Sequence, residues 1–277
     1  MSKKVFLIPT DFSEVCNNAI NQAISMAGLM DADIYLLHVV NAETKSWLKE
    51  NDLDLSAIDI KLQTITDDFK LKYGVSMQYI VREGSIFNEI ADAAKEIKAN
   101  LIFLGTHGKT GIQHLTGSFA MKVITSSEAP VLVVQRRKIE RLPKLIVLPL
   151  TSEAGPMEKT IIAANLAQSL DATIHILQCD DNEKVAEAAQ NMMEYFNKND
   201  VKSQLVISAS GSHYTNRVLE YSVENNADMI LIMTNPDKNW TSFIFGSYDE
   251  ELVFNAAQIP VLCVNPRKKE VDKIFKD

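Results

Sequence analysis

The chain has 277 residues, of which 46% are hydrophobic and 23% charged, a globular composition that excludes disordered, collagen-like and coiled-coil proteins. Acidic residues outnumber basic ones by 36 to 28, and this net charge of −8 does not suit indiscriminate binding to nucleic acid or anionic membranes. No apolar run approaches the roughly 20 residues that span a bilayer. The N-terminus lacks the apolar core of a signal peptide. We therefore expect a cytoplasmic protein without membrane or nucleic-acid partners.

Five short, β-branched apolar segments in the first half predict strands buried on both faces, at 4–8, 33–40, 76–81, 100–104 and 130–135. Between them, apolar residues recur at helical spacing over 19–27, 55–69 and 86–97, and a further helix is predicted to begin at Gly117. Strands alternating with helices indicate βαβ units, a parallel sheet and right-handed crossovers.

The second half of the chain repeats the first. Five segments recur in the same order, 128 to 140 residues further on: 5–10 with 145–150, 31–38 with 171–178, 99–104 with 227–232, 117–118 with 246–247 and 130–134 with 260–264. We therefore predict two domains, 1–137 and 142–270, joined by a basic linker. The stretch 41–52, which contains Trp47, has no clear counterpart in the second half. Trp47 is expected either to cover a site or to seal an interface.

Glycines cluster directly after the fourth predicted strand, at the edge where open α/β sheets bind ligands. Residues 105–111 read Gly-Thr-His-Gly-Lys-Thr-Gly, and Gly117-Ser118 then opens a helix. Such a loop presents backbone N–H groups to an anion, and the helix N-terminus favours a phosphate. The spacing matches neither the P-loop nor the dinucleotide-binding motif. From these residues alone, plain turn glycines are the better interpretation of Gly105 and Gly108.

Together with Pro-Val-Leu-Val-Val at 130–134, Gly105-Thr106-His107-Gly108 and Gly117-Ser118 resemble the signature of the universal stress protein family. The segments 8–13 and 36–40 also resemble the first two strands of that family. The resemblance covers the first half and, through the repeat, the second. It implies an α/β fold: two tandem copies of a five-stranded, mostly parallel, doubly wound sheet, Rossmann-like and adenine-nucleotide α-hydrolase-like.

The resemblance also implies a binding site for ATP, ADP or AMP, with or without Mg²⁺. In nucleotide-binding members, an Asp after strand 1 and a Val at the end of strand 2 hold the adenine, and the glycine loop holds ribose and phosphates. By position, the implied residues are Pro9, Thr10, Asp11, Val39, Gly105, Thr106, His107, Gly108, Lys109, Gly117, Ser118 and Phe119. Capping of the first helix by Asp11 or Ser13 is an equally good interpretation of those two residues.

Two features depart from the family pattern. Eight residues, not nine, separate Gly108 from Gly117, which puts the phosphate loop in doubt. In the second half, Thr151 stands in the place of Asp11 and Met233-Thr234-Asn235-Pro236 in that of the glycine loop, and Pro236 removes an N–H. We therefore expect the second domain to be a degenerate copy that does not bind nucleotide in this way.

The leading hypothesis is a stress-response protein that binds an adenine nucleotide in its first domain and acts as a binding and regulatory module. The alternatives are a nucleotide-free interaction protein of the same fold and a slow ATPase or adenylating enzyme. No acid–base pair, Mg²⁺-binding Asp or arginine finger can be placed, so we expect no catalytic or metal-binding residues and at most weak ATP hydrolysis. Family members pair through their last strands. The resemblance therefore implies an internal pseudo-dimer of Val131–Val134 with Val261–Val264, and allows a further homodimer.

Overall fold

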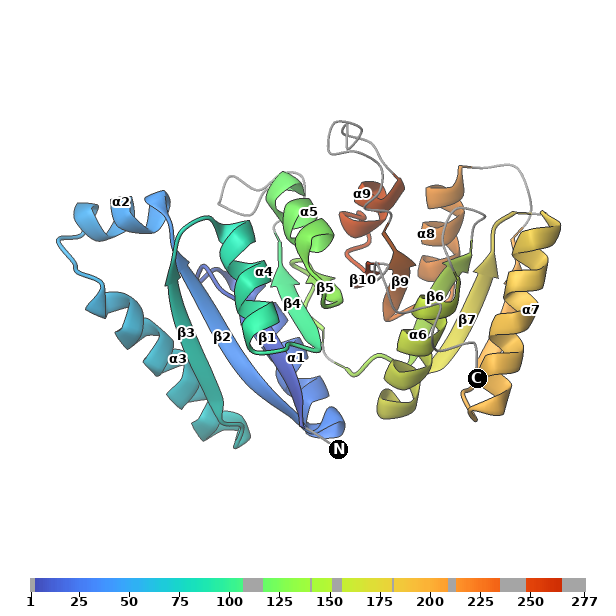
Figure 1. The fold of residues 1–277 in the computed structure, drawn as a ribbon, viewed down its shortest axis with the longest axis horizontal. Coiled ribbons are helices and arrows are strands. Elements are labelled where there is room, and N and C mark those ends of the chain that lie inside the picture. Colours follow the sequence, from blue (N-terminus) through green and yellow to red (C-terminus); the bar gives the residue numbers. More distant parts are fainter. Residues whose placement is uncertain are drawn as a thin grey trace. The chain divides into compact units, whose positions relative to one another are not determined.

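The computed structural model describes residues 3–106, 117–139, 141–150, 156–180, 182–208, 213–234 and 248–265, without the side chains of 117–118, 156–158 and 248–249. The chain divides into two compact units, unit 1 (Met1–Ile139) and unit 2 (Glu140–Asp277), close to the predicted domains 1–137 and 142–270. Both are α/β units with strands between helices (Figure 1). In the part of the chain that the structure describes, no helix is long and apolar enough to cross a membrane.

Unit 1 contains the five strands that the sequence predicts, with ends that differ by no more than two residues. They are β1 (Lys4–Pro9), β2 (Ala32–Val40), β3 (Met77–Glu83), β4 (Leu101–Gly105) and β5 (Val131–Val134). Their order is β3-β2-β1-β4-β5, and each pair of neighbours is parallel. The chain moves outward from β1 through β2 to β3 and then returns to β4 and β5. The order therefore reverses between β1 and β4, the arrangement of a doubly wound fold.

The helices of unit 1 are α1 (Glu14–Met30), α2 (Ala42–Glu50), α3 (Ser56–Tyr73), α4 (Ile86–Glu96) and α5 (Gly117–Ser126). Right-handed crossovers place the helices of the outward path on one face of the sheet and those of the return path on the other. Accordingly, α4 and α5 lie against each other in front of the sheet in Figure 1, with α1 behind it. The helix predicted to begin at Gly117 is confirmed as α5.

The core of unit 1 lies on both faces of its central strands. Phe6 of β1 and Phe103 of β4 are fully buried, with ring centroids 5.1 Å apart. Cys16 of α1 is also fully buried. The prediction of burial on both faces is wrong for β3, where Val81 is 38% exposed. In unit 1 this strand has only β2 as a neighbour, so its position at the edge leaves part of it uncovered.

The backbones of β4 and α1 touch where Gly105 ends the strand. A Cβ atom placed on Gly105 would lie 2.8 Å from the carbonyl oxygen of Val15 and 2.9 Å from the backbone nitrogen of Cys16. These are backbone atoms that cannot rotate away, so only glycine fits at this position. The first turn of α1 can therefore pack directly on the end of β4.

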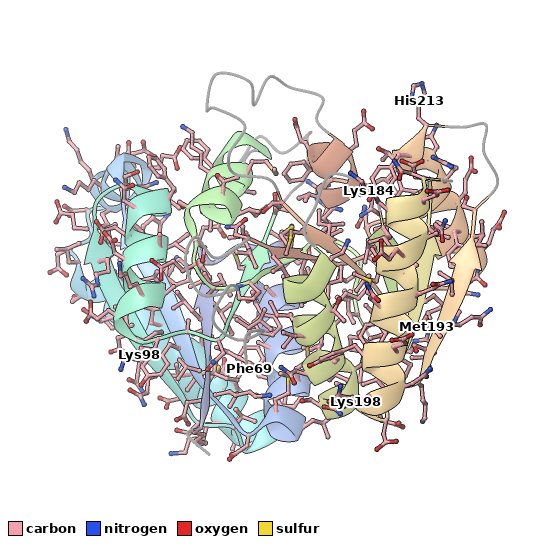
Figure 2. The ribbon with its side chains drawn as sticks, turned by 45° about the vertical axis from the view of Figure 1, so that its right-hand side comes forward. Phe69, Lys98, Lys184, Met193, Lys198 and His213 are labelled. Atoms are coloured by element: carbon pink, nitrogen blue, oxygen red, sulfur yellow. The ribbon has the colours of Figure 1, made fainter. Side chains whose placement is uncertain are left out.

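Unit 2 repeats the architecture with five parallel strands in the order β10-β9-β6-β7-β8. Its elements are β6 (Leu145–Leu150), α6 (Pro156–Leu170), β7 (Thr173–Gln178), α7 (Glu183–Lys198), β8 (Ser203–Ile207), α8 (Tyr214–Glu224), β9 (Met229–Met233), α9 (Tyr248–Val253) and β10 (Val261–Val264). The amphipathic α7 buries Val185, Met192 and Phe196, whereas Lys184 and Lys198, near its two ends, are exposed (Figure 2).

The units differ between their second and third strands. In unit 1, β2 is followed by α2 and then by α3, whereas in unit 2 the chain passes from β7 directly into α7. The stretch 41–52, which lacks a counterpart in the sequence, is therefore an additional helix, α2. Other details are shared: the N–H of Thr106 donates to Val134 O and that of Thr234 to Val264 O, both at 2.9 Å.

Replacing Gly105 by alanine is expected to destabilise unit 1, because β4 or the start of α1 must move to admit the methyl group. We expect Gly105→Ala to lower the free energy of unfolding by about 1–3 kcal/mol, as overpacking does elsewhere. Gly28→Ala is the matched control: Gly28 lies in α1, and nothing approaches its added Cβ within 4 Å. The control should raise stability by about 0.5–1 kcal/mol. Urea unfolding measures both, and equal effects would contradict the close packing at Gly105.

Candidate functional site

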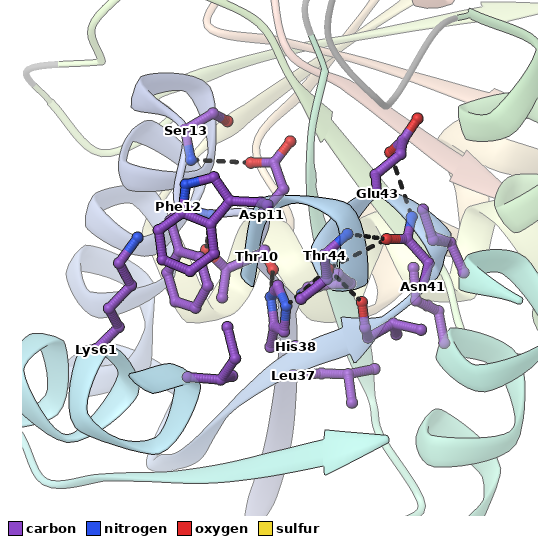
Figure 3. Close-up of a pocket in the computed structure, with 16 residues that line it drawn as sticks. Thr10, Asp11, Phe12, Ser13, Leu37, His38, Asn41, Glu43, Thr44 and Lys61 are labelled. Carbon is purple, nitrogen blue, oxygen red and sulfur yellow. Dashed lines mark hydrogen bonds between the residues drawn. The ribbon is translucent and has the colours of Figure 1, made fainter. Parts of the chain in front are cut away.

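A cavity of about 310 Å³ opens at the carboxyl ends of β1 and β2 in unit 1 (Figure 3). The ends of two strands, the turn between β1 and α1, and three helices meet there, as expected at this edge of a doubly wound fold. The lining residues are 9–13 in the turn between β1 and α1, 37–39 at the end of β2, Asn41, Glu43, Thr44 and Trp47 around α2, Ile58 and Lys61 on α3, and Ile86 and Ile90 on α4.

Four of the residues that the family resemblance implies line this cavity: Pro9, Thr10, and the two assigned to the adenine, Asp11 and Val39. The residues assigned to ribose and phosphates are not among those that line it. Gly105 ends β4 and Thr106 follows it, Gly117 and Ser118 open α5, and Phe119 lies in the first turn of that helix. His107, Gly108 and Lys109 lie outside the described residues, as do Thr151, Asn235 and Pro236 of the second half.

Asp11 organises the start of α1. Its Oδ1 accepts a hydrogen bond from the Ser13 backbone N–H at 2.9 Å and another from the Cys16 thiol at 3.1 Å. Burial raises the pKa of Cys16 to about 12, so the thiol keeps the proton that it donates. Ser13 occupies the N-cap position of α1, but its side chain makes no capping hydrogen bond. Of the two capping candidates, Asp11 is therefore the one that supports the helix start.

Phe12 adopts a left-handed backbone conformation, with φ of 67°. This region is unfavourable for a bulky residue. The turn is held by the Phe12 backbone N–H, which donates to Thr10 Oγ1 at 3.0 Å. The ring stacks on His38, with centroids 4.6 Å apart and planes 24° from parallel. The unusual backbone therefore directs an aromatic side chain into the wall of the cavity.

His38 of β2 links the separate segments around the cavity. Its Nδ1 lies 2.8 Å from the carbonyl oxygen of Thr10, and its Nε2 lies 3.3 Å from the hydroxyl of Thr44 (Figure 3). A carbonyl can only accept, so Nδ1 carries the proton, and in the neutral ring Nε2 is an acceptor that shares the single proton of the Thr44 hydroxyl with Asn41 Oδ1, 3.1 Å from that hydroxyl. One side chain thus connects the turn after β1, the end of β2 and α2.

The additional helix α2 forms one side of the cavity. Asn41 caps it by accepting a hydrogen bond from the Thr44 backbone N–H at 2.9 Å. Leu48 is its one buried residue, and Lys45 forms an ion pair with Glu83 at the end of β3. A helix of nine residues is marginal by itself, so these local contacts fix its position.

Two aromatic rings and a cation meet at the cavity. The ammonium nitrogen of Lys61 lies 4.0 Å from the centroid of the Trp47 ring and 5.1 Å from that of Phe12. Within the described residues, Lys61 makes no ion pair or hydrogen bond. Of the two positions expected for Trp47, the structure shows the one at a cavity. The side chains provide aromatic faces, a cation and the carboxylates of Asp11 and Glu43, a combination suited to a planar polar ligand.

The sequence analysis did not identify His38, Trp47 and Lys61 as a group. Neither His38 nor Lys61 was given a role there. A signal for Lys61 exists: it follows Ile58 by three positions, so both residues share one face of α3. Which loops that face meets depends on the fold of the whole unit.

Gly105 and Thr106 have structural roles that need no ligand. Gly105 admits the backbone of α1, as described above, and Thr106 is fully buried, with its N–H bonded to β5. Phe119 is half-buried, with the ammonium of Lys122 5.6 Å from its ring centroid. Among the residues that the structure places, no three metal-ligating side chains come together.

Solved structures share this architecture. The crystal structure of a universal stress protein from Archaeoglobus fulgidus superposes with a TM-score of 0.78, covering 96% of this chain and 97% of that one, at 15% sequence identity. A functionally unknown protein from Pseudomonas aeruginosa, PA1789, superposes with a TM-score of 0.64, covering 96% and 93%, at 14% identity. At such identities the likeness concerns the fold alone.

Sequence comparison is more specific. The model of the universal stress protein family matches residues 2–135. Universal stress protein MJ0531 of Methanocaldococcus jannaschii is 37% identical over 144 residues, which cover 50% of this chain and 85% of that protein. Universal stress protein MJ0577 of the same organism is 28% identical over 161 residues, covering 50% and 97%. The chain therefore belongs to the universal stress protein family, as a member with two tandem copies of the family's fold.

Proposed function

We propose that unit 1 binds an adenine nucleotide (ATP, ADP or AMP) and that the protein acts in the stress response as a binding and regulatory module. The observation that carries this proposal is the cavity at the ends of β1 and β2, because Asp11 and Val39 both line it. These two residues match those that hold adenine in nucleotide-binding relatives. The cavity also lies at the edge of the sheet where doubly wound folds bind ligands.

The size and walls of the cavity fit the base and sugar of a nucleotide. Its volume of about 310 Å³ is at the lower end of the range for small-molecule sites, roughly 300–1,000 Å³. Val39 and Ile58 are buried and apolar, and Phe12 adds an aromatic face. Phosphates would extend toward the N-terminus of α5, where free N–H groups favour an anion. Any Mg²⁺ would be held with the phosphates.

Two observations favour the alternative, a nucleotide-free interaction protein. Asp11 Oδ1 supports the start of α1, and Gly105 is required by the contact with Val15. Both residues would therefore be needed for folding even without a ligand. The two functions differ in one measurable property, the binding of an adenine nucleotide by the purified protein.

The pairing of Val131–Val134 with Val261–Val264 as an internal pseudo-dimer, and a further homodimer of whole chains, stay predictions from the family resemblance. The proposed degenerate role of unit 2 is likewise a prediction. Neither is needed for nucleotide binding by unit 1.

Asp11→Asn is expected to weaken AMP and ATP binding by about 10- to 100-fold, the contribution of a hydrogen bond to a charged group. The amide oxygen can still accept from the Ser13 N–H, so the turn before α1 should remain. Isothermal titration calorimetry measures the affinity. Asp68→Asn on the exposed surface of α3 removes the same charge away from the cavity and should leave the affinity unchanged.

Gly108→Pro tests the phosphate end separately, because it removes a backbone N–H from the proposed loop. It should weaken binding of ATP and AMP and leave adenosine unaffected. If wild type, Asp11→Asn and Gly108→Pro release equal amounts of adenine nucleotide on denaturation and titrate identically, the proposed site is wrong. If none of them binds ATP or AMP, the nucleotide-free alternative holds.

The pH range over which the cavity persists depends on His38. Burial lowers the pKa of His38 below the ordinary histidine value. The unfolded chain therefore takes up more protons than the folded chain when the pH falls through about 6.5 toward the folded-state pKa. The stabilisation is fully present above that range and is lost within it.

We expect the free energy of unfolding of unit 1 to fall between pH 7.5 and 5, with a contribution from His38 of at most about 1.4 kcal/mol per pH unit. Urea titrations of a Trp240→Phe chain, in which Trp47 is the single tryptophan and reports on unit 1, measure this. His38→Asn should flatten the pH dependence. His175→Asn in unit 2, whose pKa burial also lowers, should not change the Trp47 signal. An unchanged slope in His38→Asn would contradict this assignment.

A further inference from the structure

The additional helix α2 occurs in unit 1, which has the cavity, and not at the corresponding place in unit 2. In unit 2 only residues 179–182 separate β7 from α7. The α2 helix brings Thr44 and Trp47 to the cavity. Most of its remaining residues are exposed, and only Leu48 is buried. Little of α2 therefore packs in the core, and the side that carries Thr44 and Trp47 borders the cavity.

The face of Trp47 is covered by the ammonium of Lys61, 4.0 Å from the ring centroid. The same ammonium lies 5.1 Å from the Phe12 ring, which lines the same cavity. Lys61 is half-buried and forms neither an ion pair nor a hydrogen bond with any residue that the structure describes. Its side chain is long and flexible, so it can leave the ring without disturbing the backbone.

The magnitudes of the two interactions decide which partner the ring prefers. A cation over an aromatic face at a partly exposed site contributes about two- to fivefold to an equilibrium. A nucleobase stacked on an aromatic side chain contributes about five- to 150-fold in affinity. A planar base can therefore displace the ammonium, and the displaced cation stays within reach of an anionic ligand.

We propose that Trp47 is the stacking platform for the base of the nucleotide and that Lys61 covers this platform until the base replaces it. This inference rests on the proposed nucleotide binding by unit 1 and adds the residue that recognises the base by its flat face. Unit 2 has no helix between β7 and α7 that could carry such a platform at the corresponding place.

The test uses the full chain with Trp240→Phe, so that fluorescence reports Trp47 alone. Adding AMP should quench Trp47 emission with the same dissociation constant that calorimetry gives. Trp47→Leu, which keeps an apolar side chain but no aromatic face, should weaken AMP binding by about five- to 150-fold. Tyr73→Leu is the matched control, because Tyr73 lies on α3 outside the cavity, with Lys72 over its ring.

A second variant tests the role of the cation. Lys61→Met keeps the length of the side chain and removes the charge, and it should strengthen adenosine binding by about two- to fivefold, because nothing has to be displaced. Lys72→Met removes the corresponding cation above Tyr73, outside the cavity, and should leave adenosine binding unchanged.

Failure of this inference can be told apart from failure of the proposed function. If Asp11→Asn weakens AMP binding and Trp47→Leu does not, the nucleotide binds elsewhere in the cavity and the stacking platform is wrong. If Lys61→Met weakens AMP binding and leaves adenosine unaffected, Lys61 contacts the phosphate and does not act as a cover. If wild type binds neither AMP nor ATP in calorimetry, the proposed function fails and the inference fails with it.

Discussion

The hydrogen bond between His38 Nδ1 and the carbonyl of Thr10, 2.8 Å long, joins the ends of two adjacent parallel strands, and the cavity is built around it. A carbonyl at the buried end of a strand needs a partner, and here a side chain from the neighbouring strand supplies it. The other surfaces of the same ring meet Phe12 and Thr44. The turn after β1, the end of β2 and the helix α2 therefore depend on one imidazole for their mutual position.

The two units show how one scaffold can carry different chemistry at the same edge of its sheet. In unit 1, Val39 near the end of β2 and Asp11 after β1 line the cavity. In unit 2, Cys179 follows β7 at the position corresponding to Val39, and the buried Lys159 of α6 donates to the Pro149 carbonyl at 2.8 Å. A carboxylate thus stands near the end of β1 and a buried cation near the end of β6, although the strands themselves are alike.

The strands of unit 1 could be predicted because buried parallel strands are almost continuously apolar, and the repeat located four of the five strands of unit 2, all but β8. The partial exposure of β3 could not be predicted. It follows from the position of β3 at the edge of the sheet, which depends on the order of the strands and not on their composition. Asp11 and Val39 were found through the family resemblance. Gly105 was predicted to bind a ligand at the end of the fourth strand. The structure places it at the end of that strand, where packing against α1 already requires a glycine.

His38, Trp47 and Lys61 were missed for a common reason. His38 lies on β2, Trp47 on α2 and Lys61 on α3. The periodicity of each segment indicates which of its residues share a face, but it does not indicate which faces of different segments meet in the fold. Trp47 came closest to being identified, because it lies in the stretch 41–52, which has no counterpart in the second half of the chain. A large aromatic residue in such an additional stretch suggests a function at a site or an interface. Lys61, the partner of Trp47, shares a face of α3 with Ile58, but the sequence does not show which loops that face meets.

At Phe12, which has a left-handed backbone conformation, the residue that would give the more stable fold is not the residue that forms the wall of the cavity. Glycine would adopt φ of 67° without strain, whereas Phe carries a cost of about 1–3 kcal/mol there. An engineer seeking a more heat-resistant chain would choose glycine at this position. That substitution would remove the ring that stacks on His38 and lies beneath the Lys61 ammonium. The more stable protein would therefore lose part of the wall of its cavity.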